Sequence, residues 1–175
     1  MIFELCTDSI NGANMAKQLG AHRIELCSAL SVGGLTPSTS LAKHCSAIME
    51  TYAMIRPKEG NFVYSNEEIE LMLEDISILA EVGVKGVVFG CLTHDRQINI
   101  QQNISLVEAA RKYELATTFH RAFDFIADPL EALESIINIG FNRLLTSGKK
   151  PTAIEGIGLI QELVNSVNGQ VEIIA

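Results

Sequence analysis

The sequence of 175 residues is 47% hydrophobic and 19% charged, which is typical of a folded globular domain and argues against a disordered chain. Its formal net charge of -8, without any cluster of basic residues, argues against nucleic acid as a partner. No stretch approaches the roughly 20 apolar residues of a membrane span, and no basic leader precedes an apolar run. We therefore expect a cytoplasmic protein with no membrane partner.

Short apolar segments alternate with longer amphipathic segments along the chain, which is the pattern of repeated βαβ units. The strands are predicted near residues 2–6, 22–27, 52–56, 85–90, 115–120, 142–146 and 170–174. Between them, Ser65 with Glu68 and Thr152 with Glu155 have the capping-box spacing that starts a helix. Because no linker interrupts the alternation, we expect one continuous domain over residues 1–175.

Polar residues in the strands decide between an open parallel sheet and a closed barrel. Strands of an open sheet are covered by helices on both faces and are nearly unbroken hydrophobic runs. Here alternation collects polar residues on one face of the strands: Glu4, Cys6, Glu25, Cys27, Arg56, Thr118 and His120. This favours an α/β fold of the (β/α)8 TIM-barrel type, with its active site at the C-terminal ends of the strands.

A barrel of this type takes about 250 residues, so we expect this one to be incomplete at its C-terminus, with about seven strands and six helices present. Either the remainder lies outside this sequence, or a partner such as a second copy in a homo-oligomer covers the open edge.

The tripeptide Glu-Leu-Cys occurs twice and ends two consecutive predicted strands in a cysteine. Neighbouring strands lie about 4.8 Å apart, so the thiols of Cys6 and Cys27 could share one soft ion. Two thiolates suit Cu(I), whereas a structural zinc site needs four ligands. The alternative is that both cysteines are inert packing residues, which is the interpretation we favour for Cys45 and Cys91.

Charged residues lie near the same strand ends. A carboxylate inside a barrel is costly unless it is paired, so Glu4 and Glu25 require counter-charges. Arg56 and Arg121 are the candidates. The set forms either a structural ion-pair network or a catalytic site. In the catalytic interpretation, Glu25, His120 and Asp124 are acid–base residues, and the ligand-binding residues are Glu4, Arg56, Arg121, Thr146 and Ser147.

Two glycine-containing loops are candidates for anion binding. They are SVGGLTPS, over residues 31–38, and LTSGKKPT, over residues 145–152. Backbone N–H groups of such loops can bind phosphate, but a plain turn before a helix explains the same residues. Neither loop has the spacing of a Walker or dinucleotide-binding motif.

Four longer blocks occur in order along the chain: RIELCSALSVGGLTPS, IRPKEGNFVYS, TFHRAFD and RLLTSGKKPTAIEG. Together with FELCTDS they resemble the signature blocks of the CutC copper-homeostasis family, over essentially the whole chain. The resemblance implies a (β/α)8 barrel, a cytoplasmic protein and an association with copper. It also implies Cu(I) as the bound ion, with Cys6 and Cys27 at the matching positions, and it supplies no reaction.

Two functions follow from these observations. The first is a copper-homeostasis protein that binds Cu(I) through Cys6 and Cys27. The second is a TIM-barrel enzyme that acts on a small anionic metabolite, with glutamate and histidine as acid–base residues and arginine as the anion contact. A non-catalytic interaction protein is a third interpretation, which requires the charged residues to form a closed salt-bridge plug.

Overall fold

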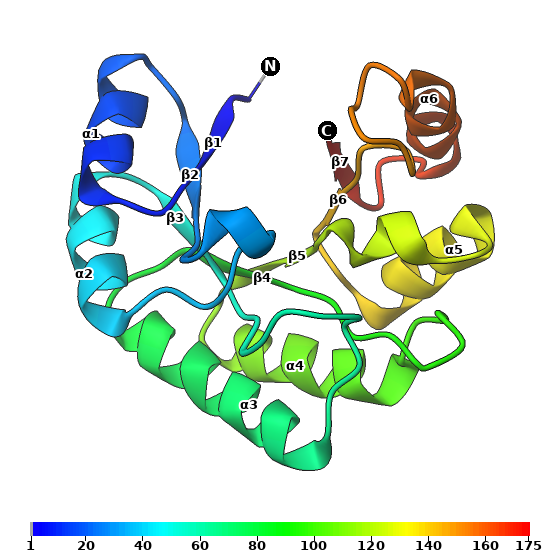
Figure 1. Cartoon of the computed structure of the whole chain (residues 1–175), viewed down its shortest axis with the longest axis horizontal. Helices are drawn as coiled ribbons and strands as arrows, with labels where there is room; N and C mark the ends of the chain where they lie inside the picture. Colours follow the sequence, from blue (N-terminus) through cyan, green and yellow to red (C-terminus); the bar gives the residue numbers. More distant parts are fainter. Residues whose placement is uncertain (1) are drawn as a thin grey trace. The chain divides into compact units, whose positions relative to one another are not determined.

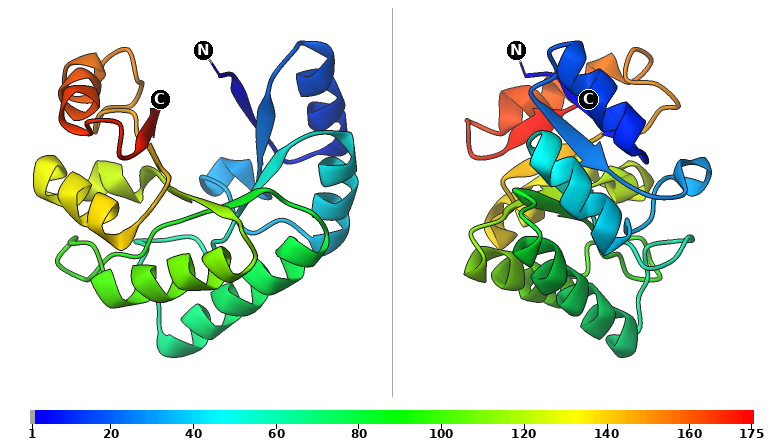
Figure 2. Two further views of the ribbon diagram at one scale, coloured as in Figure 1. Left: turned by 180° about the vertical axis from the view of Figure 1, so that it is seen from behind. Right: turned by 90° about the vertical axis from the view of Figure 1, so that its left-hand side faces the viewer.

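The computed structural model describes residues 2–175. Over this range seven strands alternate with six α-helices and two short 3-10 helices. Figure 1 and Figure 2 show these elements coloured along the sequence. Each predicted strand overlaps an observed one. The order of the elements is that of a (β/α)8 TIM-type barrel up to its seventh strand, so the predicted fold class is confirmed.

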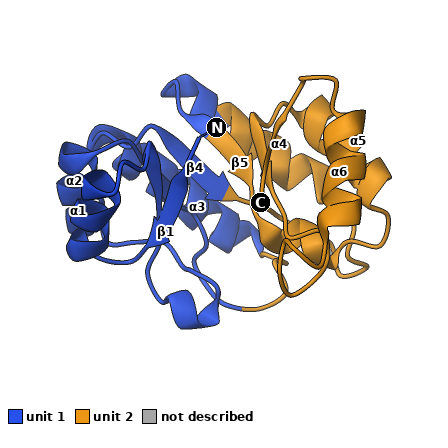
Figure 3. Cartoon of the chain, turned by 90° about the horizontal axis from the view of Figure 1, so that it is seen from above, with its two compact units in different colours: residues 1–59, 65–88, 109–116 blue, residues 60–64, 89–108, 117–175 orange. Residues whose placement is uncertain are grey.

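The chain forms two compact units, which Figure 3 shows in different colours. Unit 1 contains residues 1–59, 65–88 and 109–116, and unit 2 contains residues 60–64, 89–108 and 117–175. The single domain expected over residues 1–175 stays a prediction.

Unit 1 is built on a parallel sheet. Its strands are β1 (Glu4–Thr7), β2 (Arg23–Leu26), β3 (Thr51–Met54) and most of β4 (Gly86–Phe89). Its helices are α1 (Ile10–Gln18), η1 (Leu30–Val32), α2 (Thr39–Ile48) and α3 (Asn66–Glu81). The strands pair in the order β1-β2-β3-β4, and α1 and α2 contact each other on one side of them (Figure 1).

Helix α3 shows how the sequence starts and buries a helix. The capping box predicted at Ser65 and Glu68 is present, because each side chain accepts the backbone N–H of the other residue. The apolar residues of α3 recur at helical spacing and are buried at Ile69, Met72, Ile76 and Leu79. Each such burial stabilises the fold by about 2 kcal/mol.

Unit 2 carries the remaining elements. Its strands are most of β5 (Ala116–Phe119), β6 (Arg143–Leu145) and β7 (Glu172–Ile174). Its helices are most of α4 (Ile100–Lys112), η2 (Arg121–Phe125), α5 (Pro129–Ile139) and α6 (Ile157–Ser166). The strands β5, β6 and β7 pair in parallel, and α5 and α6 lie to one side of β6 and β7 (Figure 2). The rings of Phe89 and Phe119 pack on Phe141 with centroids 5.1 and 5.3 Å away.

One predicted helix start is wrong. Helix α6 begins at Ile157 and has Gly156 as its N-cap, whereas the capping-box spacing placed the start at Thr152. Thr152 Oγ1 does accept the N–H of Glu155, but the residues that follow form turns. Gly156 packs so closely that a Cβ there would lie 1.9 Å from the carbonyl oxygen of Ser147. This contact holds the turn against the preceding loop and delays the helix.

Across residues 2–175, none of the helices combines the length and the apolar character that crossing a bilayer requires.

Candidate functional site

Side chains from the first two strands meet in unit 1. Strands β1 and β2 pair with Cys6 opposite Glu25, and Cys27 lies two residues after Glu25, so all three share one face. The Sγ atoms of Cys6 and Cys27 are 4.0 Å apart. Glu25 Oε1 lies 3.7 Å from Cys6 Sγ and 3.6 Å from Cys27 Sγ. Two thiols and one carboxyl group thus form a compact cluster of candidate metal ligands.

This Cys6–Glu25–Cys27 cluster is buried on one side and accessible on the other. Cys27 and Glu25 are 1% and 5% exposed, whereas Cys6 is exposed. Cys27 packs in an apolar group with Tyr52 and Met54. An ion would therefore reach the cluster from the side of Cys6.

Burial changes the acidity of the cluster. It raises the pKa of Glu25 to about 7, with a further rise from the charge of Glu4, while the hydrogen bonds from the two thiols act in the opposite direction. The pKa of Cys27 is raised far above its ordinary value by its hydrogen bond with Cys6, by burial and by the charge of Glu25. Without a cation, the Cys27 thiol therefore keeps its proton at neutral pH.

The counter-charge of Glu4 is a residue that the sequence analysis missed. Arg23 Nε donates to Glu4 Oε2 at 2.5 Å, and the side chains of the pair are only 8% and 12% exposed. The guanidinium also lies over the ring of Tyr52, 5.2 Å from its centroid. The signal was present in the sequence, because Arg23 precedes Glu25 by two residues and so points to the same face.

Arg56, a predicted ligand-binding residue, holds the glycine loop that follows β2. Its Nη1 donates to the carbonyl oxygens of Val32 and Gly34 at 2.9 and 2.8 Å. Gly34 has a φ of +87°, and a Cβ there would lie 2.9 Å from Cys27 Sγ. Glycine is therefore required for the loop to pass close to the thiol. Through this loop Arg56 supports the surroundings of Cys27.

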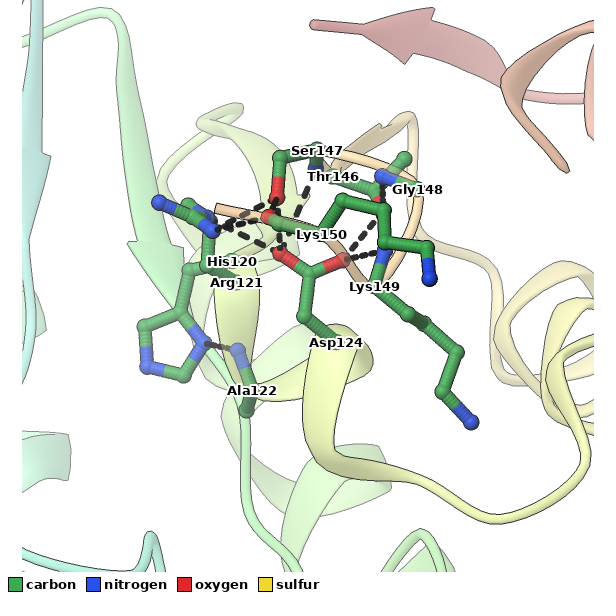
Figure 4. Close-up of polar contacts among 9 residues, drawn as sticks. All are labelled: His120, Arg121, Ala122, Asp124, Thr146, Ser147, Gly148, Lys149 and Lys150. Carbon is green, nitrogen blue, oxygen red and sulfur yellow. Dashed lines mark hydrogen bonds and ion pairs between the residues drawn. The ribbon is translucent and has the colours of Figure 1, made fainter. Parts of the chain in front are cut away.

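A second polar cluster, centred on Asp124, lies in unit 2 and is drawn in Figure 4. The Asp124 Oδ1 atom accepts from Thr146 Oγ1 at 2.5 Å and from the N–H of Lys149 at 3.0 Å. Its Oδ2 accepts from Arg121 Nε at 2.9 Å and from the N–H and the hydroxyl of Ser147 at 3.2 and 3.1 Å. The carboxylate of Asp124 thus accepts hydrogen bonds from the loop over residues 145–152, which the sequence offered as a candidate for anion binding.

These contacts fix the charge state of Asp124 and the position of Arg121. Burial alone would raise the pKa of Asp124, but the hydrogen bonds, above all that from Thr146, outweigh burial and lower it. The side chain of Asp124 is 7% exposed, whereas that of Arg121 is 51% exposed. Arg121 Nη2 also donates to Ser147 Oγ at 2.6 Å. Asp124 therefore holds a partly exposed guanidinium in one orientation.

His120 is buried at the end of β5, next to this cluster. Its Nδ1 accepts the N–H of Ala122 at 3.3 Å, so a neutral ring carries its proton on Nε2. The ring packs edge-on to Phe62, with centroids 4.9 Å apart, and against Gly90, where a Cβ would lie 2.8 Å from Nδ1. The backbone thus fixes both the tautomer and the position of the ring.

The predicted site residues fall into two groups. Unit 1 holds Glu4, Cys6, Glu25, Cys27 and Arg56, and unit 2 holds His120, Arg121, Asp124, Thr146 and Ser147. The structure brings the residues of each group into the contacts described above, and a single pocket shared by both groups stays a prediction. The N–H of Lys149 lies in the loop over residues 145–152 that the sequence offers as a candidate for anion binding, but no pattern in the sequence indicates that its partner is Asp124 of the same chain.

The protein-family model described as the CutC family matches residues 1–175. A CutC family protein of Pasteurella multocida is 43% identical over 100% of this chain and 72% of its own length. A human relative named copper homeostasis protein cutC homolog is 44% identical over 97% of this chain, and the match spans 62% of the human protein.

Solved structures are similar to this chain as well. A crystal structure of a CutC protein from Streptococcus agalactiae superposes with a TM-score of 0.91 at 33% identity, over 99% of this chain and 86% of that one. A phosphonopyruvate hydrolase superposes with a TM-score of 0.70 at 16% identity, over 99% of this chain and 66% of that one, and shows the fold alone. The resemblance inferred from the sequence blocks is confirmed: the chain belongs to the CutC family.

Proposed function

We propose that this chain is a copper-homeostasis protein that binds Cu(I) through Cys6 and Cys27. The human relative carries copper homeostasis in its name. The observation that supports binding in this chain is the pair of thiol sulfurs 4.0 Å apart on adjacent strands. Soft thiolate ligands favour Cu(I), so the donor atoms fit the ion.

The surroundings of the thiols fit a site that loads from solvent. Each thiol must lose its proton to become a ligand. The carboxyl oxygen of Glu25, within 3.7 Å of both sulfurs, accepts hydrogen bonds from both thiols in the metal-free protein. Cys6 is exposed and gives the ion access, while buried Cys27 anchors the ion against the apolar packing of unit 1.

The other two cysteines are packing residues in this proposal. Cys45 and Cys91 are each 0% exposed, and burial raises the pKa of both thiols. They therefore provide a matched control for loss of thiols outside the cluster. All four cysteines are free, which fits the cytoplasmic location that we also propose.

The test is an anaerobic titration of the reduced protein with Cu(I) against a chromogenic competitor. The Cys6→Ala/Cys27→Ala variant should lose the tight site, whereas the Cys45→Ala/Cys91→Ala variant should retain it. Equal affinity of the Cys6→Ala/Cys27→Ala variant and the wild type would refute the proposal. Far-UV circular dichroism of each variant establishes that the fold is retained.

One observation favours an enzyme that acts on a small anionic metabolite as the second candidate. The half-exposed guanidinium of Arg121 is oriented by Asp124 and Ser147, beside a histidine of fixed tautomer. In this candidate Arg121 binds the anion, His120 transfers protons, and Asp124 acts on Arg121 as a positioning residue. Thr146 and Ser147 hold Asp124 in place.

A thermal-shift screen of carboxylated and phosphorylated metabolites tests this candidate. A true ligand should raise the melting temperature of the wild type, and the effect should be lost in Arg121→Ala. It should persist in Arg111→Ala, which removes an exposed arginine near the end of α4. A ligand that stabilises Arg121→Ala as well as the wild type does not bind through this guanidinium.

A further inference from the structure

The Cys6–Glu25–Cys27 cluster contains an oxygen donor that a two-thiolate Cu(I) site does not use. Glu25 Oε1 is nearly equidistant from the two sulfurs, at 3.7 and 3.6 Å, and the sulfurs are 4.0 Å apart. The three donor atoms therefore form a nearly equilateral triangle. Glu25 is 5% exposed, so its carboxyl group is held in place by the surrounding protein.

The size of this triangle can be compared with the coordination shell of zinc. Zn²⁺ lies about 2.3 Å from a thiolate sulfur and about 2.1 Å from a carboxylate oxygen, in a tetrahedral arrangement. These values place two sulfur ligands about 3.8 Å apart and a sulfur and an oxygen ligand about 3.6 Å apart. The distances in the cluster match this pattern to about 0.2 Å, before any adjustment on binding.

The chemistry of the donors points in the same direction. Carboxylate oxygen is a hard ligand that Cu(I) does not favour, whereas Zn²⁺ binds sulfur, nitrogen and oxygen ligands. Sites with three protein ligands and an open fourth position are the catalytic type of zinc site. Because Cys6 is exposed and the other two ligands are buried, the open position would face solvent on the side of Cys6.

We propose that Cys6, Glu25 and Cys27 bind Zn²⁺ as a three-ligand site with an open fourth position. This inference shares the thiol pair of the proposed function and adds Glu25 as the ligand that admits a divalent ion. On binding, both thiol protons and any proton on Glu25 pass to solvent, and two thiolates and one carboxylate leave the site with one net negative charge. The carboxylate of Glu4 on the same strand as Cys6 is paired with Arg23.

Co²⁺ is the probe, because cobalt bound to thiolates absorbs in the near ultraviolet by charge transfer and shows visible bands that report the coordination number. The reduced protein is titrated anaerobically with Co²⁺, which is then displaced by Zn²⁺. We expect thiolate-to-cobalt absorption in the wild type, its loss in Cys6→Ala/Cys27→Ala, and an affinity at least about tenfold lower in Glu25→Gln. Glu50→Gln is the matched control and should bind Co²⁺ as tightly as the wild type, since it removes an exposed glutamate of the same unit that is not a ligand.

Cu(I) titration of the same variants separates this inference from the proposed function. Glu25→Gln should keep its affinity for Cu(I), which also shows that the variant is folded, while its affinity for Co²⁺ and Zn²⁺ falls. If the wild type binds Cu(I) but neither divalent ion, or if Glu25→Gln binds Co²⁺ as tightly as the wild type, the zinc inference is wrong and the copper proposal stands. If Cys6→Ala/Cys27→Ala keeps the Cu(I) affinity of the wild type, the copper proposal is wrong.

Discussion

Replacing Asp124 by asparagine should lower the free energy of unfolding by about 3 kcal/mol. The substitution keeps the shape of the side chain but leaves only one oxygen to accept hydrogen bonds. If the amide nitrogen takes the place of Oδ1, Thr146 and the N–H of Lys149 lose their acceptor. If it takes the place of Oδ2, Arg121 and both donors of Ser147 lose theirs.

The magnitude follows from these contacts. At least two hydrogen bonds to a charged acceptor are lost in either orientation, and each is worth about 1.5–3 kcal/mol. The loss stays below the upper end of the resulting range, because removing a largely buried charge recovers part of its desolvation cost. A loss of about 3 kcal/mol is a large part of the 5–15 kcal/mol that is typical of a folded domain.

Urea denaturation of wild type, Asp124→Asn and the control Asp95→Asn measures this difference. Asp95 is an exposed aspartate of the same unit. Because the pKa of Asp124 is lowered in the folded state, its contribution to stability is complete above the unfolded pKa of about 3.9. The contribution is lost as the pH falls through the folded pKa. The difference between wild type and variant should therefore be constant near neutral pH and shrink below about pH 4.

A difference below about 0.5 kcal/mol at neutral pH would refute the reasoning, since this is the usual effect of a surface substitution. A large difference that did not shrink in acid would show that the carboxylate charge is not its cause.

Three further predictions test the surroundings of the Cys6–Glu25–Cys27 cluster. Because burial raises the pKa of Glu25 to about 7, its contribution to the stability of the metal-free protein is complete below about pH 4.5 and is lost as the pH rises through 7. Between pH 4.5 and pH 7 the free energy of unfolding of the wild type should therefore fall by about 3 kcal/mol relative to that of Glu25→Gln. Urea denaturation of both proteins across this pH range measures the difference. A difference that did not change with pH would contradict the prediction. Gly34→Ala should lower the free energy of unfolding by at least about 1 kcal/mol, because Gly34 has a positive φ and the added Cβ would meet Cys27 Sγ. An unchanged melting temperature would be evidence against the close approach of this loop to Cys27. A double-mutant cycle with Glu4→Gln and Arg23→Met should give a coupling energy of about 1–3 kcal/mol, and a value near zero would mean that the pair contributes nothing.

The strands could be predicted because each is a short apolar or alternating run between turns. Residues 22–27 were predicted as a strand, and β2 occupies Arg23–Leu26. Of two helix starts predicted from capping-box spacing, one is observed and the other is not. The capping box at Ser65 follows from local contacts, whereas the start of α6 depends on the contact of Gly156 with the loop at Ser147, which no local pattern reveals.

The positions of the Cys6–Glu25–Cys27 cluster could be predicted from the sequence, because they depend on two regular features of a parallel sheet. Alternation puts Glu25 and Cys27 on one face of β2, and parallel pairing of consecutive strands brings Cys6 beside them. Arg23 lies on the same face by the same alternation. It was not predicted as the counter-charge of Glu4, because Arg56 and Arg121 were the predicted candidates. The ion pair needs only the neighbouring strand, where Glu4 is opposite Arg23.

The Asp124 cluster could not be derived in the same way. Asp124 lies 22 to 25 residues before the donors of its loop, and their contact depends on how η2 follows β5 and how the loop follows β6. The sequence marked the loop from Thr146 to Lys149 as a candidate anion site. Only the structure shows that a carboxylate of the chain itself fills it.

Anaerobic Cu(I) titration of the wild type, Cys6→Ala/Cys27→Ala and Cys45→Ala/Cys91→Ala tests the copper proposal most directly. We predict one tight Cu(I) site in the wild type and in Cys45→Ala/Cys91→Ala, and none in Cys6→Ala/Cys27→Ala. Tight binding that survives the loss of Cys6 and Cys27, or that disappears with Cys45 and Cys91 while the fold is intact, would contradict the assignment of copper to this cluster.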